Sequence, residues 1–103
     1  MRKITEESIN AFYNKGKLNK QNMSVFYDRY DQTSRMLLHN NCIATYDHDN
    51  KQLKISNCGW FSNTTKERLN ALLNVNIQQN NFKWFLNGHL WDGQPITIKN
   101  IKQ

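Results

Sequence analysis

The feature that most constrains the fold is the alternation of apolar and polar residues between Ser24 and Ser56. Four strand-like runs lie in this segment, at residues 25–27, 36–38, 42–46 and 53–55. A period of two is typical of strands, and turn-forming residues at 31–34, 40–41 and 47–50 separate the runs. Because a parallel pairing needs a crossover of a dozen or more residues, these short connections predict a four-stranded antiparallel meander.

A helix is predicted before the meander, over residues 5–15. Thr5 is a suitable N-cap, and Ile4 and Ile9 stand at the two positions of a hydrophobic staple. Gly16 follows directly and favours a left-handed stop.

A second helix is predicted to begin at Thr64 and to end near Asn74. Thr64 and Glu67 have the spacing of a capping box, with Thr64 at the N-cap. Helical spacing gives this segment a buried stripe made of Leu69, Leu72 and Leu73. The same spacing turns two basic residues, Lys66 and Arg68, away from that stripe.

The last third of the chain predicts a hairpin and one more strand. Asn87-Gly88 lies between the apolar runs 82–86 and 89–91, and such a pair is the strongest short-range hairpin signal. Residues 96–98 alternate and follow Pro95. The expected fold is α+β, with an antiparallel sheet (the meander plus a C-terminal hairpin and strand) and two helices packed on one face, in a single domain over residues 1–103.

No stretch approaches the roughly 20 apolar residues that span a bilayer, and the N-terminus lacks the apolar run of a signal peptide. We therefore expect no contact with a membrane and a location in the cytoplasm. Cys42 and Cys58 are then expected to remain reduced thiols that pack as small apolar side chains. The oligomeric state is left open between monomer and homodimer.

The chain has 14 Lys and Arg against 8 Asp and Glu, a net charge of +6. This balance favours phosphate groups or acidic protein surfaces as partners, and solubility alone explains it equally well. Lys15, Lys17 and Lys20 are close together in a predicted loop suited to phosphate contact. Arg29 and Arg35 stand near strand aromatics in a pattern that suits single-stranded bases. The candidate partner-binding residues are Lys15, Lys17, Lys20, Arg29, Arg35, Trp60, Lys66 and Arg68.

Trp60 has two interpretations. It follows Gly59, which permits an unusual backbone conformation, and it precedes the second predicted helix. It is either an exposed anchor of the kind that dominates interfaces or a lid on the core, and the lid is the more common outcome.

Metal and catalytic sites are weakly indicated. His39, Cys42, His48 and Cys58 are residue types that zinc prefers, but their spacing matches no compact zinc site. His39, Asp47, His48 and Asp49 could serve a small metal-dependent hydrolase, although a solvated turn explains 47–49 better. The chain contains no phosphate-binding loop, dinucleotide fingerprint or nucleophile elbow. We expect no catalysis, no metal and no cofactor.

Three segments carry a family resemblance: residues 37–44, Gly59-Trp60 followed by residues 64–72, and residues 84–93 with Trp84-Phe85-Leu86-Asn87-Gly88 and Trp91-Asp92-Gly93. The most specific part is Trp60 followed by Thr64-Thr65 and Arg68-Leu69-Asn70. The chain resembles a group of small bacteriophage and prophage proteins with no established activity.

The resemblance implies a phage accessory protein that acts in a bacterial cytoplasm and carries over no catalytic residues. It implies binding to a host or defence complex, for example a CRISPR effector, which the protein would modulate or inhibit. The basic charge argues against mimicry of nucleic acid. A nucleic-acid-binding module is the first alternative, and the metal-dependent hydrolase is the second.

Overall fold

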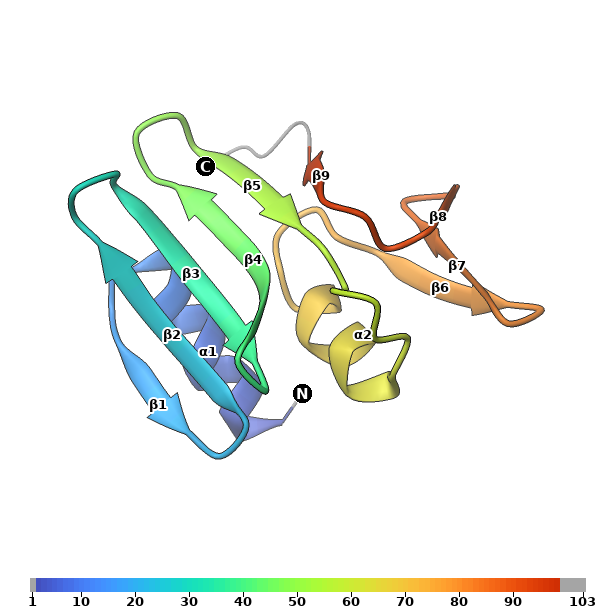
Figure 1. Cartoon of the computed structure of the whole chain (residues 1–103), viewed down its shortest axis with the longest axis horizontal. Coiled ribbons are helices and arrows are strands. Elements are labelled where there is room, and N and C mark those ends of the chain that lie inside the picture. The colour runs from blue at the N-terminus through green and yellow to red at the C-terminus, as the bar shows by residue number, and fades with distance from the viewer. Residues whose placement is uncertain (1, 99–103) are drawn as a thin grey trace.

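The computed structural model describes residues 2–98 and contains two helices and nine strands within that range (Figure 1). The helices are α1 (Lys3–Tyr13) and α2 (Asn63–Asn70). The strands before α2 are β1 (Leu18–Lys20), β2 (Met23–Asp28), β3 (Thr33–Leu38), β4 (Asn41–Asp47) and β5 (Gln52–Ile55). The strands after α2 are β6 (Ile77–Asn80), β7 (Lys83–Leu86), β8 (His89–Trp91) and β9 (Ile96–Ile98). The α+β class is confirmed.

The larger sheet has six strands in the order β1-β2-β3-β4-β5-β9, and every pairing in it is antiparallel. Its centre, β2 to β5, is the predicted meander. Strand β1 was expected to be a loop, and that prediction was wrong because its only apolar residue is Leu18, which pairs with Val25. One apolar residue in three gives no periodic signal.

The smaller sheet contains β6, β7 and β8. The predicted hairpin is confirmed as β7 and β8, and its turn residues Asn87 and Gly88 have φ of 50° and 88°. Positive φ at both central residues is the reason Asn-Gly favours this turn. The predicted strand at 96–98 is also confirmed, but it leaves the hairpin and pairs with β5, placing Ile96 opposite Ile55.

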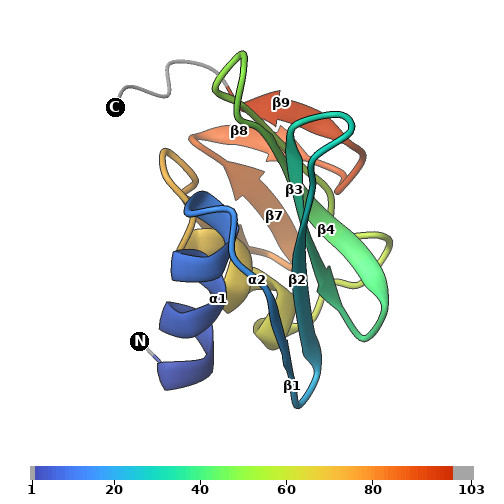
Figure 2. The same ribbon diagram turned by 90° about the vertical axis from the view of Figure 1, so that its left-hand side faces the viewer.

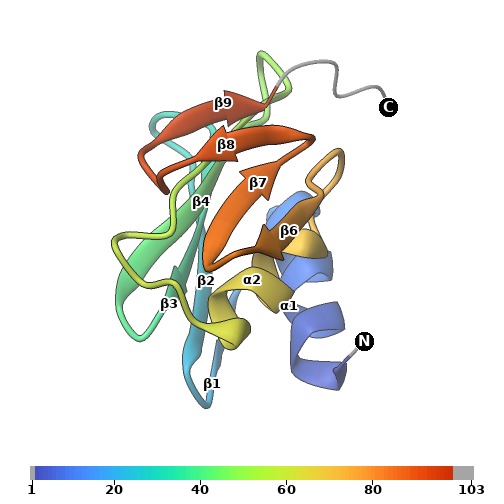
Figure 3. The ribbon, with the colours of Figure 1, turned by 90° about the vertical axis from the view of Figure 1, so that its right-hand side faces the viewer.

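Both helices lie on the same side of the six-stranded sheet, as expected, and the smaller sheet lies beside α2 on that side (Figures 2 and 3). The core between these layers includes Phe12 of α1, Met36 of β3, Leu69 of α2 and Trp84 of β7. Residues at alternate positions, such as Phe26 and Arg35, face away from the helices.

Helix α1 begins two residues earlier than predicted, and Thr5 is not its cap. The capping residue is Arg2, whose side chain makes no capping bond. Thr5 is fully buried in the first turn, where its hydroxyl donates to the Glu67 carboxylate at 2.8 Å. The left-handed residue at the C-terminal end is Lys15, with φ of 58°, rather than Gly16. Lys15 can stand there because Gly16 N then reaches the carbonyl of Ala11 at 2.7 Å, which satisfies an end carbonyl of the helix.

Helix α2 also begins earlier than predicted. Its N-cap is Ser62, whose Oγ accepts from the N–H of Thr65 at 3.1 Å, so Thr64 and Glu67 form no capping box. Two side-chain placements were wrong as well. Leu73 lies beyond the helix and is exposed, whereas Arg68 is only 2% exposed because it packs toward α1.

A candidate binding cavity beside Trp60

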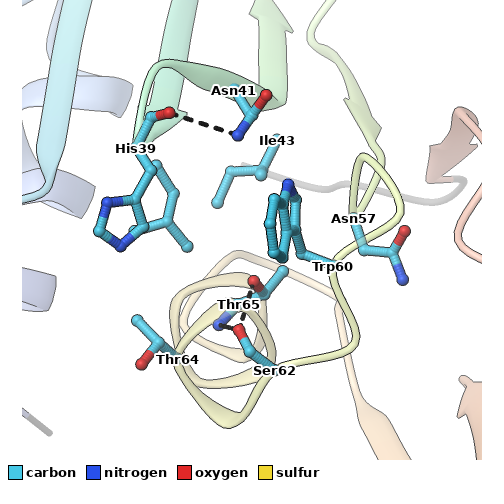
Figure 4. Close-up of a pocket in the computed structure, with 9 residues that line it drawn as sticks. His39, Asn41, Ile43, Asn57, Trp60, Ser62, Thr64 and Thr65 are labelled. Carbon is cyan, nitrogen blue, oxygen red and sulfur yellow. Dashed lines mark hydrogen bonds between the residues drawn. The ribbon is translucent and has the colours of Figure 1, made fainter.

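A cavity of about 450 Å³ opens between the β3–β4 turn, the loop from β5 to α2, and the first turn of α2 (Figure 4). This size falls within the range of small-ligand and side-chain pockets. The residues that line it are Leu38, His39, Asn41, Ile43, Asn57, Trp60, Ser62, Thr64 and Thr65. We call it the Trp60 cavity.

The β3–β4 turn forms one wall. Its central residues, His39 and Asn40, have φ of 50° and 67°, as a two-residue hairpin turn requires. The N–H of His39 donates to the carbonyl of Asn22 at 2.9 Å, and the Asn41 amide donates to the carbonyl of His39 at 3.3 Å. These bonds fix the backbone of the turn, from which the His39 side chain lines the cavity.

The loop from β5 to α2 forms the opposite wall and carries Trp60. Its turn holds Cys58 and Gly59 at φ of 54° and 84°, and the N–H of Trp60 donates to the carbonyl of Asn57 at 2.9 Å. Trp60 is 60% exposed, and its ring stands near Ile43 across the cavity (Figure 4). At this exposure Trp60 does not seal the core and instead lines the cavity.

Phe61, the next residue, packs against the aromatic part of the core. Its ring packs edge-on against the buried Trp84 with centroids 5.1 Å apart. Trp84 is 1% exposed and also lies against Trp91. Of the two neighbouring aromatics, Phe61 contacts the buried core and Trp60 lines the cavity.

The floor is the first turn of α2. The Ser62 hydroxyl contacts the Thr65 hydroxyl at 2.9 Å in addition to capping the helix. Among the described residues, no lining side chain is Asp, Glu, Lys or Arg. Apolar surface from Leu38, Ile43 and Trp60 therefore faces neutral hydroxyl and amide groups, an arrangement that suits an uncharged, partly apolar guest.

Comparison with known proteins gives the family. The family model described as Kyanoviridae Gp96 protein matches residues 1–101. The chain belongs to this family. Membership in this bacteriophage family confirms the resemblance to small phage proteins that the sequence indicated. Searches of the curated proteins and of the solved structures returned no match.

In this Gp96 family member, the structure does not gather the predicted basic residues around the Trp60 cavity. Lys15 lies over the ring of Tyr27, with the ammonium 5.5 Å from the centroid. Lys20 belongs to β1 and forms an ion pair with Glu7 of α1 at 2.9 Å. Lys17 is exposed just before β1. None of these three lysines lines the Trp60 cavity.

The remaining predicted basic contacts are dispersed. Arg29 is exposed in the β2–β3 turn. Arg35 projects from the outer face of the sheet and pairs with Asp31 at 2.6 Å and Asp28 at 3.6 Å. Its guanidinium lowers the pKa of Asp31 by hydrogen bonding. The ammonium of Lys66 donates to Gln79 of β6 at 2.9 Å.

Arg68 is buried and offers no surface to a partner. Its Nη1 donates to the Thr5 hydroxyl at 3.0 Å and contacts the carboxylate of Glu67. Its Nη2 reaches the amide oxygen of Asn22 at 3.4 Å. The helical period suggested an exposed position, but packing of α2 against α1 places this arginine between the two helices.

The proposed metal ligands do not come together. His39 and His48 lie in the turns at opposite ends of β4, so neither the zinc set nor the hydrolase set is assembled. Within residues 2–98, no group of three His, Cys, Asp or Glu side chains is placed to hold a metal ion. Cys42 and Cys58 are both exposed, contrary to the expectation that they pack inside.

His48 instead forms a partly buried polar contact with Ser34. The Ser34 hydroxyl lies 2.7 Å from Nε2 of His48, and the imidazole packs edge-on against the rings of Tyr27 and Tyr46. Burial, followed by the charge of Lys15, lowers the pKa of His48. Ser34 has no exposed surface, so its hydroxyl is available only to groups inside the sheet.

Sequence reasoning found Trp60 but missed most of the cavity around it. Leu38 and Ile43 were assigned only to strands, and Ser62 was not recognised as the cap of α2. A signal was present in Asn57-Cys58-Gly59, since a tight turn next to a helix start leaves the following side chain at the surface.

No helix within the described range is long and apolar enough to span a membrane.

Proposed function

We propose that this protein is a phage accessory protein that binds a protein complex of the infected cell, without catalysis, through the Trp60 cavity. The observation that carries the proposal is an exposed Trp beside a formed cavity. Exposed Trp residues are enriched among those that dominate binding energy, particularly where a pocket accepts a partner side chain. The complex belongs to the host or to its defence systems, and we place the encounter in its cytoplasm.

The lining of the cavity indicates which part of the partner is bound. Its walls combine Leu38, Ile43 and the indole of Trp60 with neutral donors and acceptors. An apolar or aromatic side chain on the partner can enter with its polar end facing Thr64 or Asn41. The basic side chains that remain exposed, such as Lys17 and Arg29, then add long-range attraction to an acidic partner rather than direct contacts.

The test is capture of partners from a lysate of infected bacteria by the tagged protein. Trp60→Ala is compared with Tyr30→Ala, which removes an aromatic side chain that is 95% exposed at the β2–β3 turn. We expect Trp60→Ala to reduce recovery of the partner at least 30-fold, equivalent to about 2 kcal/mol at a hot spot. Tyr30→Ala should capture the partner like the wild type.

Nuclease treatment of the lysate separates the protein partner from nucleic acid. A partner that persists after nuclease and is lost in Trp60→Ala supports the proposal. Capture that disappears with nuclease, or that falls steeply as salt rises, would favour the nucleic-acid alternative, because cationic contacts to phosphates release counterions. Equal capture by wild type and Trp60→Ala would exclude the cavity as the binding site.

A further inference from the structure

The two cysteines of the chain lie next to one another at the surface and are sequence neighbours of residues that line the Trp60 cavity. Cys42 is in β4 and Cys58 is in the loop from β5 to α2, and both side chains are exposed. The Cys58 thiol donates to the carbonyl of Cys42 at 3.0 Å. The N–H of Ser56 also donates to the carbonyl of Ile43 at 2.9 Å, so the loop still follows β4 at this point.

This contact brings the cysteines within reach of a covalent link. A carbonyl oxygen and its own Cα are separated by two bonds, so the 3.0 Å contact places the Cys42 Cα within about 6 Å of the Cys58 sulfur. The Cys58 Cα lies about 3 Å from its own sulfur, so the two Cα atoms are at most about 8 Å apart, a range that includes the roughly 4.4–6.8 Å at which disulfides form. The Cys42 thiol contacts the carbonyl of Ala44 at 3.5 Å, and the other staggered χ1 rotamers would give its sulfur different directions.

We propose that Cys42 and Cys58 are a dithiol modification site, which a small disulfide reagent of the glutathione class converts into an intramolecular disulfide. One cysteine thiolate attacks the S–S bond of the reagent and expels one glutathione thiolate. The other cysteine then attacks the cysteine sulfur of the mixed disulfide and expels the second glutathione thiolate. The two cysteines lose two electrons and two protons, and the reagent is reduced to two thiols.

The position of this site connects it to the cavity. Asn41 and Ile43, on either side of Cys42, line the cavity, and Trp60 comes two residues after Cys58. A disulfide would tie the loop that carries Trp60 to β4, which forms the opposite wall. The further expectation that oxidation changes partner binding rests on the proposed function, whereas the disulfide itself does not.

The reaction is tested on the reduced full-length protein with oxidised glutathione. The wild type should lose both titratable thiols and about 2 Da of mass, the loss of two hydrogens, without forming a disulfide bond between chains. Cys42→Ser and Cys58→Ser should each stop at a mixed disulfide with one glutathione, because the resolving thiol is missing. Partial burial raises the pKa of Cys42, so reactions that begin at Cys42 should accelerate as the pH rises.

Three results would overturn the proposal: two glutathione adducts on one wild-type chain, two unreacted thiols, or disulfide-linked dimers in place of the internal bond. Partner capture is then compared between reduced and oxidised wild type. A change of tenfold or more places the disulfide in control of the cavity, and equal capture removes that control. If the reduced wild type captures no partner, the proposed function fails while the thiol and mass measurements still decide the dithiol site.

Discussion

Arg68 of α2 donates a hydrogen bond to the Thr5 hydroxyl of α1 at 3.0 Å, and this bond joins the two helices inside the molecule. The same hydroxyl donates to Glu67, whose carboxylate also contacts Arg68. Thr5 and Arg68 are 63 residues apart in the sequence. Burying an arginine is costly unless its charge is paired, and although Nε of Arg68 has no partner, Nη1 is bonded to both Thr5 and Glu67, so this three-residue contact fixes how α2 sits against α1.

Arg68→Ala is therefore expected to lower the free energy of unfolding by about 2–4 kcal/mol, because it leaves Thr5 and Glu67 without their cationic partner. Urea unfolding followed by circular dichroism measures the change. Lys66→Ala is the matched control: it removes a neighbouring cation that bonds Gln79 at the surface, and it should change stability by less than about 0.5 kcal/mol. Similar losses in both variants would show that Arg68 does not hold the helices together.

Gly93→Ala should destabilise the protein more than Gly88→Ala. The two glycines have nearly equal positive φ, 89° and 88°, so the backbone cost of an alanine, about 1–2 kcal/mol, is shared. At Gly93 a Cβ would lie 2.1 Å from Oδ1 of the buried Asn57, whereas at Gly88 nothing lies within 4 Å. Overpacking adds about 1–3 kcal/mol at Gly93 alone. Thermal unfolding of the two variants gives the difference, and equal losses would contradict the steric argument.

Phe82→Gly is expected to stabilise the protein by about 0.5–1 kcal/mol. Phe82 is 95% exposed in the β6–β7 turn and has φ of 66°, a region that costs an L-residue roughly 1–2 kcal/mol and costs glycine almost nothing. Tyr30→Gly is the control, since Tyr30 is equally exposed in a turn but lies outside the left-handed region. It should lose about 0.5–1 kcal/mol of stability. A loss in both variants would mean that the Phe82 ring contributes packing of its own.

His48 should make the protein less stable as the pH falls. Its pKa is lowered in the folded state, so the unfolded chain takes up a proton near pH 6.5 that the folded protein still excludes. The free energy of unfolding then decreases between about pH 7 and pH 5.5, and the loss continues until the pH reaches the folded pKa. Urea titrations at several pH values measure this slope. His48→Gln should flatten it, and the exposed His89→Gln should keep it; a wild-type slope in His48→Gln would assign the effect to another group.

Local signals were sufficient for much of the fold. The meander and the β7–β8 hairpin follow from alternation and from Asn87-Gly88, because turn chemistry and a period of two act over a few residues. The errors occur where a residue suits two roles. Thr5 has the chemistry of a cap, but its hydroxyl bonds the Glu67 carboxylate instead. The N-cap of α2 is Ser62 rather than Thr64, because the helix begins at Asn63 and the Ser62 hydroxyl accepts from the N–H of Thr65.

The sequence by itself determined the strands of the meander, the existence of both helices and the family of the chain. Pairing between distant segments decided the rest: β9 joins β5, Arg68 turns inward to Thr5, and Cys58 meets Cys42. The Trp60 cavity also depends on three segments that meet only in the folded chain. Periodicity reports which face of an element is apolar, but contacts between elements are set by packing and burial, which no local pattern encodes.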